Sequence, residues 1–453
     1  MTAMARTWDR LTLPGKALAI IVPLGAVLTL GLIITLVLFG QNILDILIFN
    51  LPIVRFVFSA LILLLLAPPI AFVIIYMEMK IIAMMNLRIG PDRVGPWGSL
   101  LSTVHGLKVL MKEDFTPTRA DPVVFTWAPV VVFSTMALSA LVIPFAPGLF
   151  AQDFNIGLLY FFAIGGMTVV GLLMGGWASF NKYSLLGGLR SAAQIVSYEI
   201  PLTLSVVGLI ILAGTMSLNT IVQQQGVSGW FTDWYVIRQP LGFLIFFIAA
   251  TAEANRTPFD LTEADSEIVA GFATEYSGMR FGFFFFAEYI GVFVISALTT
   301  VLFLGGWNAP FPVPHISWIV DPGALGIGLL FVIAIVPLVA TLLFAAPFYL
   351  FRSKTRWWVA LILGFVLFNV VAGGLLGLWA FINFDWVAGL IWFLGKTFGL
   401  VFLFVWMRGT LPRVRIDQLM GFAWKWLLPA SLLNLFVTAL AVLVIDVMKG
   451  GKL

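Results

Sequence analysis

Long apolar runs, separated by shorter polar segments, recur from one end of this sequence to the other. A helix rises 1.5 Å per residue and therefore needs about 20 apolar residues to cross the hydrocarbon core of a membrane. Transmembrane β-strands would instead show short segments of alternating polarity. The pattern predicts an all-α, polytopic membrane protein with about eleven spans. The expected spans are residues 17–39, 52–77, 122–146, 156–180, 194–214, 239–255, 279–304, 324–350, 357–381, 388–407 and 422–446.

The composition agrees with this class and narrows the chemistry. Of 453 residues, 61% are hydrophobic and 10% are charged, whereas a soluble domain has about 25% charged residues. The sequence has no cysteine, so it offers no disulfide and no thiolate ligand for zinc or an iron–sulfur cluster. Its two histidines, His105 and His315, are too few for a histidine-rich metal centre. We therefore expect no metal, haem or cluster in this chain, and any redox chemistry must be supplied by a partner.

Basic residues indicate how the helices are oriented. Arg6, Arg10 and Lys16 precede the first span, and no clear cleavage site follows it, so we expect a retained helix and a cytoplasmic N-terminus. The cytoplasmic loops would then be residues 78–121, 181–193, 256–278, 351–356 and 408–421. Most lysines and arginines fall on that side or within the membrane, as the positive-inside rule requires.

The first long inner loop contains RIGPDRVGPWG, in which two Gly-Pro steps force an irregular path. After Ser99, apolar residues recur at helical spacing and predict an amphipathic helix at the membrane surface. The apolar positions are Leu100, Val104, Leu107 and Met111, while His105, Lys108 and Lys112 lie on other sides of the helix. The alternative is an ordinary solvated loop with basic residues.

Seven of the 21 acidic residues lie within residues 253–288. They are Glu253, Asp260, Glu263, Asp265, Glu267, Glu275 and Glu288. A cytoplasmic loop would be expected to carry basic residues, so this acidic stretch needs another explanation. Clustered carboxyls disfavour each other's ionisation and can exchange protons near neutral pH. The alternative is a set of solvated or salt-bridged structural groups.

Three acids fall within or at the ends of predicted spans: Glu199, Glu253 and Glu288. An acid inside a membrane costs about 2.5–3.5 kcal/mol on insertion scales and usually has a function, such as a proton path, an ion site or pairing with a buried base. Lys396 is a candidate base of this kind, although a lysine that bends toward the nearer interface is an equal alternative. The basic segment 408–426 is interpreted as an ordinary inner loop.

Several motifs closely resemble one membrane-subunit family of respiratory complex I, the family of its H subunit, whose mitochondrial counterpart is called subunit 1. The matching segments are RIGPDRVGPWG, KEDFTP, GGWASFNKYSLLGGLRSAAQIVSYEIPL, AEANRTPFDLTEADSEIVAGFATEYSGM and RGTLPRVRIDQLM. The resemblance implies a subunit of a proton-translocating NADH:quinone oxidoreductase in a prokaryotic cell membrane. Such a subunit forms much of the quinone chamber, joins the cluster-bearing peripheral arm to the antiporter-like membrane subunits, and has no activity alone. Quinone would be its substrate, and it would bind no nucleic acid.

The resemblance also assigns roles to individual residues. Proton coupling is implied for Glu199, Glu253, Glu288 and Lys396. A place beside quinone is implied for Glu78, Lys80, Arg88, Arg256, Asp260, Glu263, Asp265, Glu267 and Glu275. The chain departs from the family at Met79, where an arginine is usual, and the loss of this cation near the quinone entrance could be compensated by Lys80 or Arg88.

Three spans are extra compared with the eight of the family. The expected organisation is an additional helix and linker in residues 1–51, a family-like core with the quinone-site loops in 52–320, an inserted helix pair in 321–385 and family-like helices in 386–453. One alternative function is the equivalent subunit of a membrane-bound hydrogenase or of a ferredoxin- or F420-linked dehydrogenase. A free-standing secondary transporter is an alternative from a different class.

Overall fold

The computed structural model describes residues 52–151, 153–227, 229–260, 270–311 and 385–448. Almost all of these residues belong to one compact unit made of Pro52–Pro312 and Gly389–Leu453. The predicted spans 17–39, 324–350 and 357–381 lie outside the described residues, so the count of eleven spans and the side of the N-terminus stay predictions.

Helices are the only regular elements among the described residues, and seven of them are long and apolar enough to cross a membrane. The main helices are α3 (Pro52–Met85), α5 (Pro122–Ala140), α6 (Gly157–Ala178), α7 (Lys182–Ala213), α10 (Pro240–Glu253), α12 (Gly278–Phe303), α16 (Asp385–Thr410), α17 (Ile416–Phe422) and α18 (Leu428–Met448). Each of the eight spans predicted for this part of the chain has a helical counterpart, with α10 shorter than the others. The all-α membrane class is confirmed.

Two predicted boundaries are wrong. Residues 181–193 were expected to form a loop, but α7 begins at Lys182 and its first turn is capped by the Asn181 side chain, which accepts from the Tyr183 N–H at 2.9 Å. Hydropathy missed this stretch because it is rich in serine and glycine, yet the buried Ser184 hydroxyl is satisfied by donating to the Phe272 carbonyl at 2.9 Å. Similarly, α3 continues to Met85, so Glu78 lies on a helix and not in the loop 78–121.

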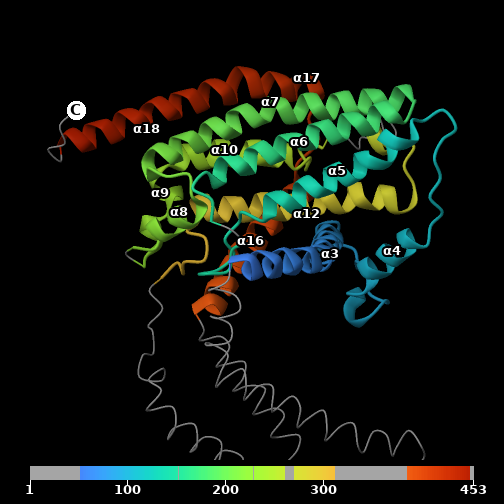
Figure 1. Cartoon of the computed structure of the whole chain (residues 1–453), viewed down its shortest axis with the longest axis horizontal. Helices are drawn as coiled ribbons and strands as arrows, with labels where there is room; N and C mark the ends of the chain where they lie inside the picture. Colours follow the sequence, from blue (N-terminus) through green and yellow to red (C-terminus); the bar gives the residue numbers. More distant parts are fainter. Residues whose placement is uncertain (1–51, 152, 228, 261–269, 312–384, 449–453) are drawn as a thin grey trace, which may run out of the picture. The chain divides into compact units, whose positions relative to one another are not determined.

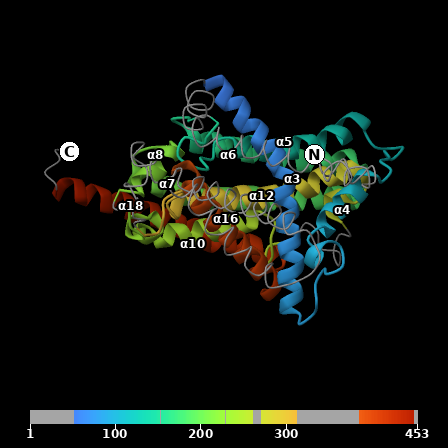
Figure 2. The same cartoon turned by 90° about the horizontal axis from the view of Figure 1, so that it is seen from below.

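The predicted surface helix is present as α4 (Leu101–Leu110). Short helices also occur in the connection between α7 and α10, namely α8 (Leu218–Gln224) and α9 (Tyr235–Arg238). Both views place α4 near one end of the long helices and α8 near the other (Figures 1 and 2). Loops predicted for opposite sides of the membrane therefore lie at opposite ends of the helices.

Two helices organise the packing. Helix α7 packs against α6, α10 and α18, and α12 packs against α3, α4 and α5 (Figure 1). Small residues allow this close approach, as is usual in membrane helix bundles. A Cβ atom on Gly187 of α7, for example, would lie 2.6 Å from the backbone of Gly271, just before α12. This packing brings the loop that precedes α12 against α7, close to the site described next.

The remaining short elements are η2 (Pro96–Gly98), η3 (Phe231–Asp233), η4 (Gly271–Ala273) and a π-helical turn, η5 (Ala423–Leu427). The π turn joins α17 to α18. Next to it, the buried Tyr198 of α7 donates its hydroxyl to the Leu419 carbonyl at 2.9 Å, and Trp424 donates its indole N–H to the Ser197 hydroxyl at 3.3 Å. These bonds hold the C-terminal helices against the part of α7 that carries Glu199.

Candidate functional site

A buried chain of alternating charges joins three helices. Arg256, in the loop after α10, is 4% exposed. Its Nη1 lies 3.3 Å from Oε2 of Glu78 on α3, and its Nη2 lies 3.3 Å from Oε1 of Glu288 on α12. The other oxygen of Glu78 pairs with Arg408 on α16. The order Glu288, Arg256, Glu78, Arg408 thus connects segments that are distant in the sequence.

The surroundings of Arg256 keep it charged. Burial would lower the pKa of its guanidinium, but the carboxylates of Glu288 and Glu78 outweigh burial and hold the pKa above its usual value. The guanidinium also lies over the ring of Tyr289, with its Cζ 4.4 Å from the ring centroid. A cation over an aromatic face gains further electrostatic attraction, most strongly where water is excluded. Arg256 is therefore a fixed positive charge at the centre of the site.

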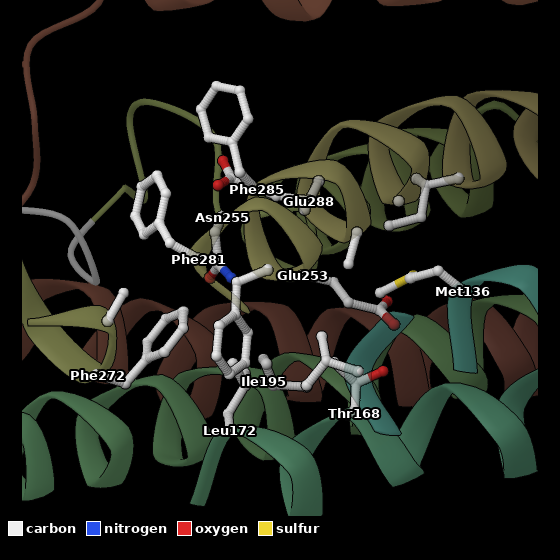
Figure 3. A pocket seen from close by; sticks show the side chains of 17 residues that line it. Met136, Thr168, Leu172, Ile195, Glu253, Asn255, Phe272, Phe281, Phe285 and Glu288 are labelled. Atoms are coloured by element: carbon white, nitrogen blue, oxygen red, sulfur yellow. The ribbon is translucent and has the colours of Figure 1, made fainter. Parts of the chain in front are cut away.

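A small cavity of about 50 Å³ lies beside these paired charges and has both Glu253 and Glu288 in its wall. Figure 3 shows Glu253, Thr168 and Met136 at one end of it and three phenylalanine rings, Phe272, Phe281 and Phe285, toward the other. A water molecule needs a cavity of about 10–15 Å³ and polar groups to which it can hydrogen-bond. The cavity is therefore large enough for a few water molecules between the two acids.

Glu199 and Glu253 both approach α6, at two consecutive residues of that helix. They come from α7 and α10. Two consecutive glycines of α6 leave room for them: a Cβ atom on Gly166 would lie 3.2 Å from Oε1 of Glu199, and one on Gly165 would lie 3.8 Å from Oε1 of Glu253. The three predicted intramembrane acids are thus brought into one region, with Glu253 between the other two.

A larger cavity of about 320 Å³ lies between α3, α4 and α12. Its wall is mostly aromatic and aliphatic, with basic side chains from α4. The lining residues are Phe72, Ile75, Ser102, His105, Gly106, Lys108, Val109, Lys112, Phe281, Gly282, Phe285 and Phe286. Phe281 and Phe285 also line the small cavity, so the same two rings of α12 border both spaces.

Other members of the acidic stretch have separate partners. Asp260 is buried and pairs with Nη2 of Arg413 at 3.0 Å, while Glu275 accepts from the Asn181 side chain at 2.6 Å. The acids that the structure describes in residues 253–288 therefore do not form one common cluster. Glu263, Asp265 and Glu267 lie outside the described residues.

Lys396 occupies a different part of the bundle. Its Nζ donates to the Leu304 and Asn308 carbonyls, both at 2.7 Å, where α12 ends, and lies 4.5 Å from the centroid of a Trp234 ring. Glu288 is in the opposite half of α12, sixteen residues before Leu304, which is about 24 Å along a helix. The structure thus does not bring Lys396 together with the three acids.

The remaining predicted positions are more open. Lys80 is partly exposed and Arg88 is exposed. Sequence reasoning missed two partners, Arg408 and Arg413, because both lie in a segment that looks like an ordinary inner loop. The sequence did offer one indication that these arginines have acidic partners. Both follow the inner end of a predicted span, on the same side of the membrane as the acids that lacked an explanation. Among the described residues, no group of three histidine, cysteine, aspartate or glutamate side chains could hold a metal ion.

Fold and site together define a helical, multi-spanning membrane protein with a buried path of alternating charges beside an apolar cavity. Comparison with known proteins identifies the family: the NADH dehydrogenase family matches residues 57–439, and the chain belongs to it. The chain is 43% identical over 364 residues to the H subunit of NADH-quinone oxidoreductase from Anoxybacillus flavithermus, covering 80% of this chain and 86% of the relative. Relatives with the same name are 42% identical in Bacillus cytotoxicus, over 85% of this chain and 94% of the relative, and 41% identical in Dehalococcoides mccartyi, over 82% of each.

Replacement of Arg256 by methionine tests whether its positive charge stabilises the structure by pairing with Glu78 and Glu288. Glu78 and Glu288 would lose their shared cation inside the protein, and the loss of one partner of a buried ion pair costs about 3–5 kcal/mol. We expect R256M to lower the thermal unfolding temperature of the purified complex clearly. R238M, which removes an exposed ion pair with Asp233, is the control and should change stability by about 1 kcal/mol or less. Equal stability of the two variants would contradict this role for Arg256.

Proposed function

We propose that this chain is the quinone-chamber and proton-coupling membrane subunit of a proton-translocating NADH:quinone oxidoreductase. The observation that carries the proposal is that Phe281 and Phe285 border both cavities. One cavity has apolar walls suited to a hydrophobic substrate, and the other has Glu253 and Glu288 in its wall. A quinone whose tail lies in the first space would thus be close to groups that can carry protons in the second.

The larger cavity suits the hydrophobic tail of a quinone. Phenylalanine rings from α3 and α12 supply most of its apolar wall, as in the predominantly hydrophobic sites that bind most small molecules. We infer that quinone enters laterally through this cavity, between α3 and α12, and that its head group passes toward the segments 78–96 and 256–280. Electrons would come from clusters held by partner subunits, because this chain has no cysteine to hold one.

The charged chain supplies the coupling in this proposal. Two unit charges 4 Å apart interact by about 4 kcal/mol at an effective dielectric constant of 20. Reduction of quinone near Arg256 would add negative charge and weaken the hold of Arg256 on Glu78 and Glu288. A proton taken up from water could then bind to Glu288 and, through the small cavity, be exchanged with Glu253 and Glu199. From there it would pass toward the neighbouring membrane subunits. These steps do not involve Lys396, and its part in coupling stays a prediction.

Replacement of Glu253 by glutamine tests the coupling. The amide keeps the shape of the side chain but cannot carry a proton, so we expect fewer protons pumped per electron pair, with a smaller loss of quinone reduction. The measurement is proton uptake by proteoliposomes together with NADH oxidation. E113Q, at an exposed position between α4 and α5, is the control. Full pumping and full quinone reduction by E253Q would remove Glu253 from the mechanism.

Replacement of Gly282 by leucine tests the quinone path. The new side chain would occupy part of the larger cavity, since a Cβ atom at this position lies 3.1 Å from Val109 on the opposite wall. We expect the KM for a long-tailed quinone to rise at least roughly tenfold, the scale of one misplaced methylene group in an apolar pocket. The KM for a short-tailed analogue should change less. G399L is the matched control, because a Cβ atom on Gly399 meets nothing within 4 Å. An unchanged KM in G282L would place the quinone elsewhere.

Purification separates this function from the alternatives. The relatives are named as subunits of a quinone oxidoreductase, and these names do not favour the alternative of a hydrogenase or a ferredoxin-linked dehydrogenase. We expect the chain to purify in mild detergent with iron–sulfur proteins of a peripheral arm and with other membrane subunits, identified by mass spectrometry. A secondary transporter would purify alone, and a hydrogenase complex would contain a nickel-binding subunit. Either result would overturn the proposed function.

A further inference from the structure

Helix α4 has an uncovered apolar face. Val104 is 45% exposed and Leu107 is 51% exposed, and their spacing places them on one stripe of the helix. Met111, the residue that caps the end of α4, continues this stripe and is 87% exposed. Such a stripe is unfavourable in water and is typical of a helix that lies in the interface of a membrane. Neither quinone reduction nor proton coupling, as proposed above, uses this face.

Another side of α4, together with the turn that follows it, brings two lysines to the larger cavity. His105, Lys108 and Lys112 belong to its lining, whereas the rest of the wall is mostly aromatic or aliphatic. A quinone has a neutral head group and a hydrocarbon tail, so it does not require these positive charges. The combination of an apolar interior with basic side chains is complementary to an anionic amphiphile with a hydrocarbon chain.

Nearby acids leave the two lysines available. Asp114 follows soon after Lys112, but its carboxylate pairs with Nε of Arg280 at 3.1 Å. Glu113 is exposed, and its backbone carbonyl accepts a hydrogen bond from the Ser277 hydroxyl. Within the described part of the chain, neither Lys108 nor Lys112 forms an ion pair within 4.0 Å.

We propose that this cavity binds an anionic phospholipid, with the phosphate held by Lys108 and Lys112 and one acyl chain inside the cavity. The exposed stripe of α4 places the helix among lipids, which gives the cavity direct access to such a ligand. The proposal rests on the proposed function, because the acyl chain and the quinone tail then compete for the same space. Anionic lipid would therefore raise the KM for quinone without changing kcat.

Proteoliposomes test this competition. Wild type, K108Q/K112Q and a control double variant, K182Q/K425Q, are compared in phosphatidylcholine alone and in phosphatidylcholine mixed with phosphatidylglycerol. The control removes two exposed lysines that do not line the cavity. A basic residue near an anionic membrane contributes about 1 kcal/mol, which corresponds to roughly fivefold in affinity. For the two lysines together we expect phosphatidylglycerol to raise the KM of wild type and control roughly 25-fold. The kcat should be unchanged, and the KM of K108Q/K112Q should stay nearly constant.

Several results would overturn the lipid site. One is an equal rise of KM in K108Q/K112Q and wild type, and another is no rise in wild type. A loss of quinone reduction by K108Q/K112Q in phosphatidylcholine alone would assign the lysines to quinone or to a partner protein. Native mass spectrometry should also detect phosphatidylglycerol on wild type and less on K108Q/K112Q. Failure of the proposed function is distinguishable, because the wild-type complex would then not reduce quinone in phosphatidylcholine or G282L would have a normal KM.

Discussion

Burial of the Arg256 guanidinium imposes the strongest constraint on this structure. A cation that is 4% exposed requires anionic partners, and these come from α3 and α12 through Glu78 and Glu288. Glu78 in turn requires a second cation because it is itself buried, and Arg408 brings α16 to the same point. Helices α3, α12 and α16, from different parts of the chain, therefore meet at one connected group of charges. Of these helices, α12 contributes to the walls of both cavities and α3 to the wall of the larger one.

Helix α12 connects this site with the rest of the bundle. One side of its first half carries Glu288, and Phe281 and Phe285 lie between the two cavities. Its other end is fastened by Lys396, which satisfies carbonyls of Leu304 and Asn308 that have no partner within the helix. A lysine near a helix C-terminus also interacts favourably with the helix dipole. The contacts thus give Lys396 a clear structural effect, which is separate from any part it has in coupling.

The proposed proton path runs through a cavity of only about 50 Å³. Gly165 and Gly166 provide room for two carboxyls from α10 and α7, and the volume between Glu253 and Glu288 suits a few water molecules. The membrane interior makes such isolated acids costly, so they are held where protein groups and water can satisfy them. Apolar packing and charge placement are therefore parts of the same arrangement.

The apolar runs determined the helical membrane class, because only helices can satisfy their own backbone in lipid. They also located the helices of the described part of the chain, seven of which are long enough to span a membrane. The cost of charge in a membrane likewise singled out Glu199, Glu253 and Glu288 from the sequence alone. Hydropathy could not predict that α7 begins at Lys182, since buried serines look polar until their carbonyl partners are known. Only the tertiary structure decided that Arg408 meets Glu78, that Asp260 meets Arg413 and that Lys396 lies apart from the acids. These pairings depend on distances between segments far apart in the chain, and local sequence patterns carry no information about such distances.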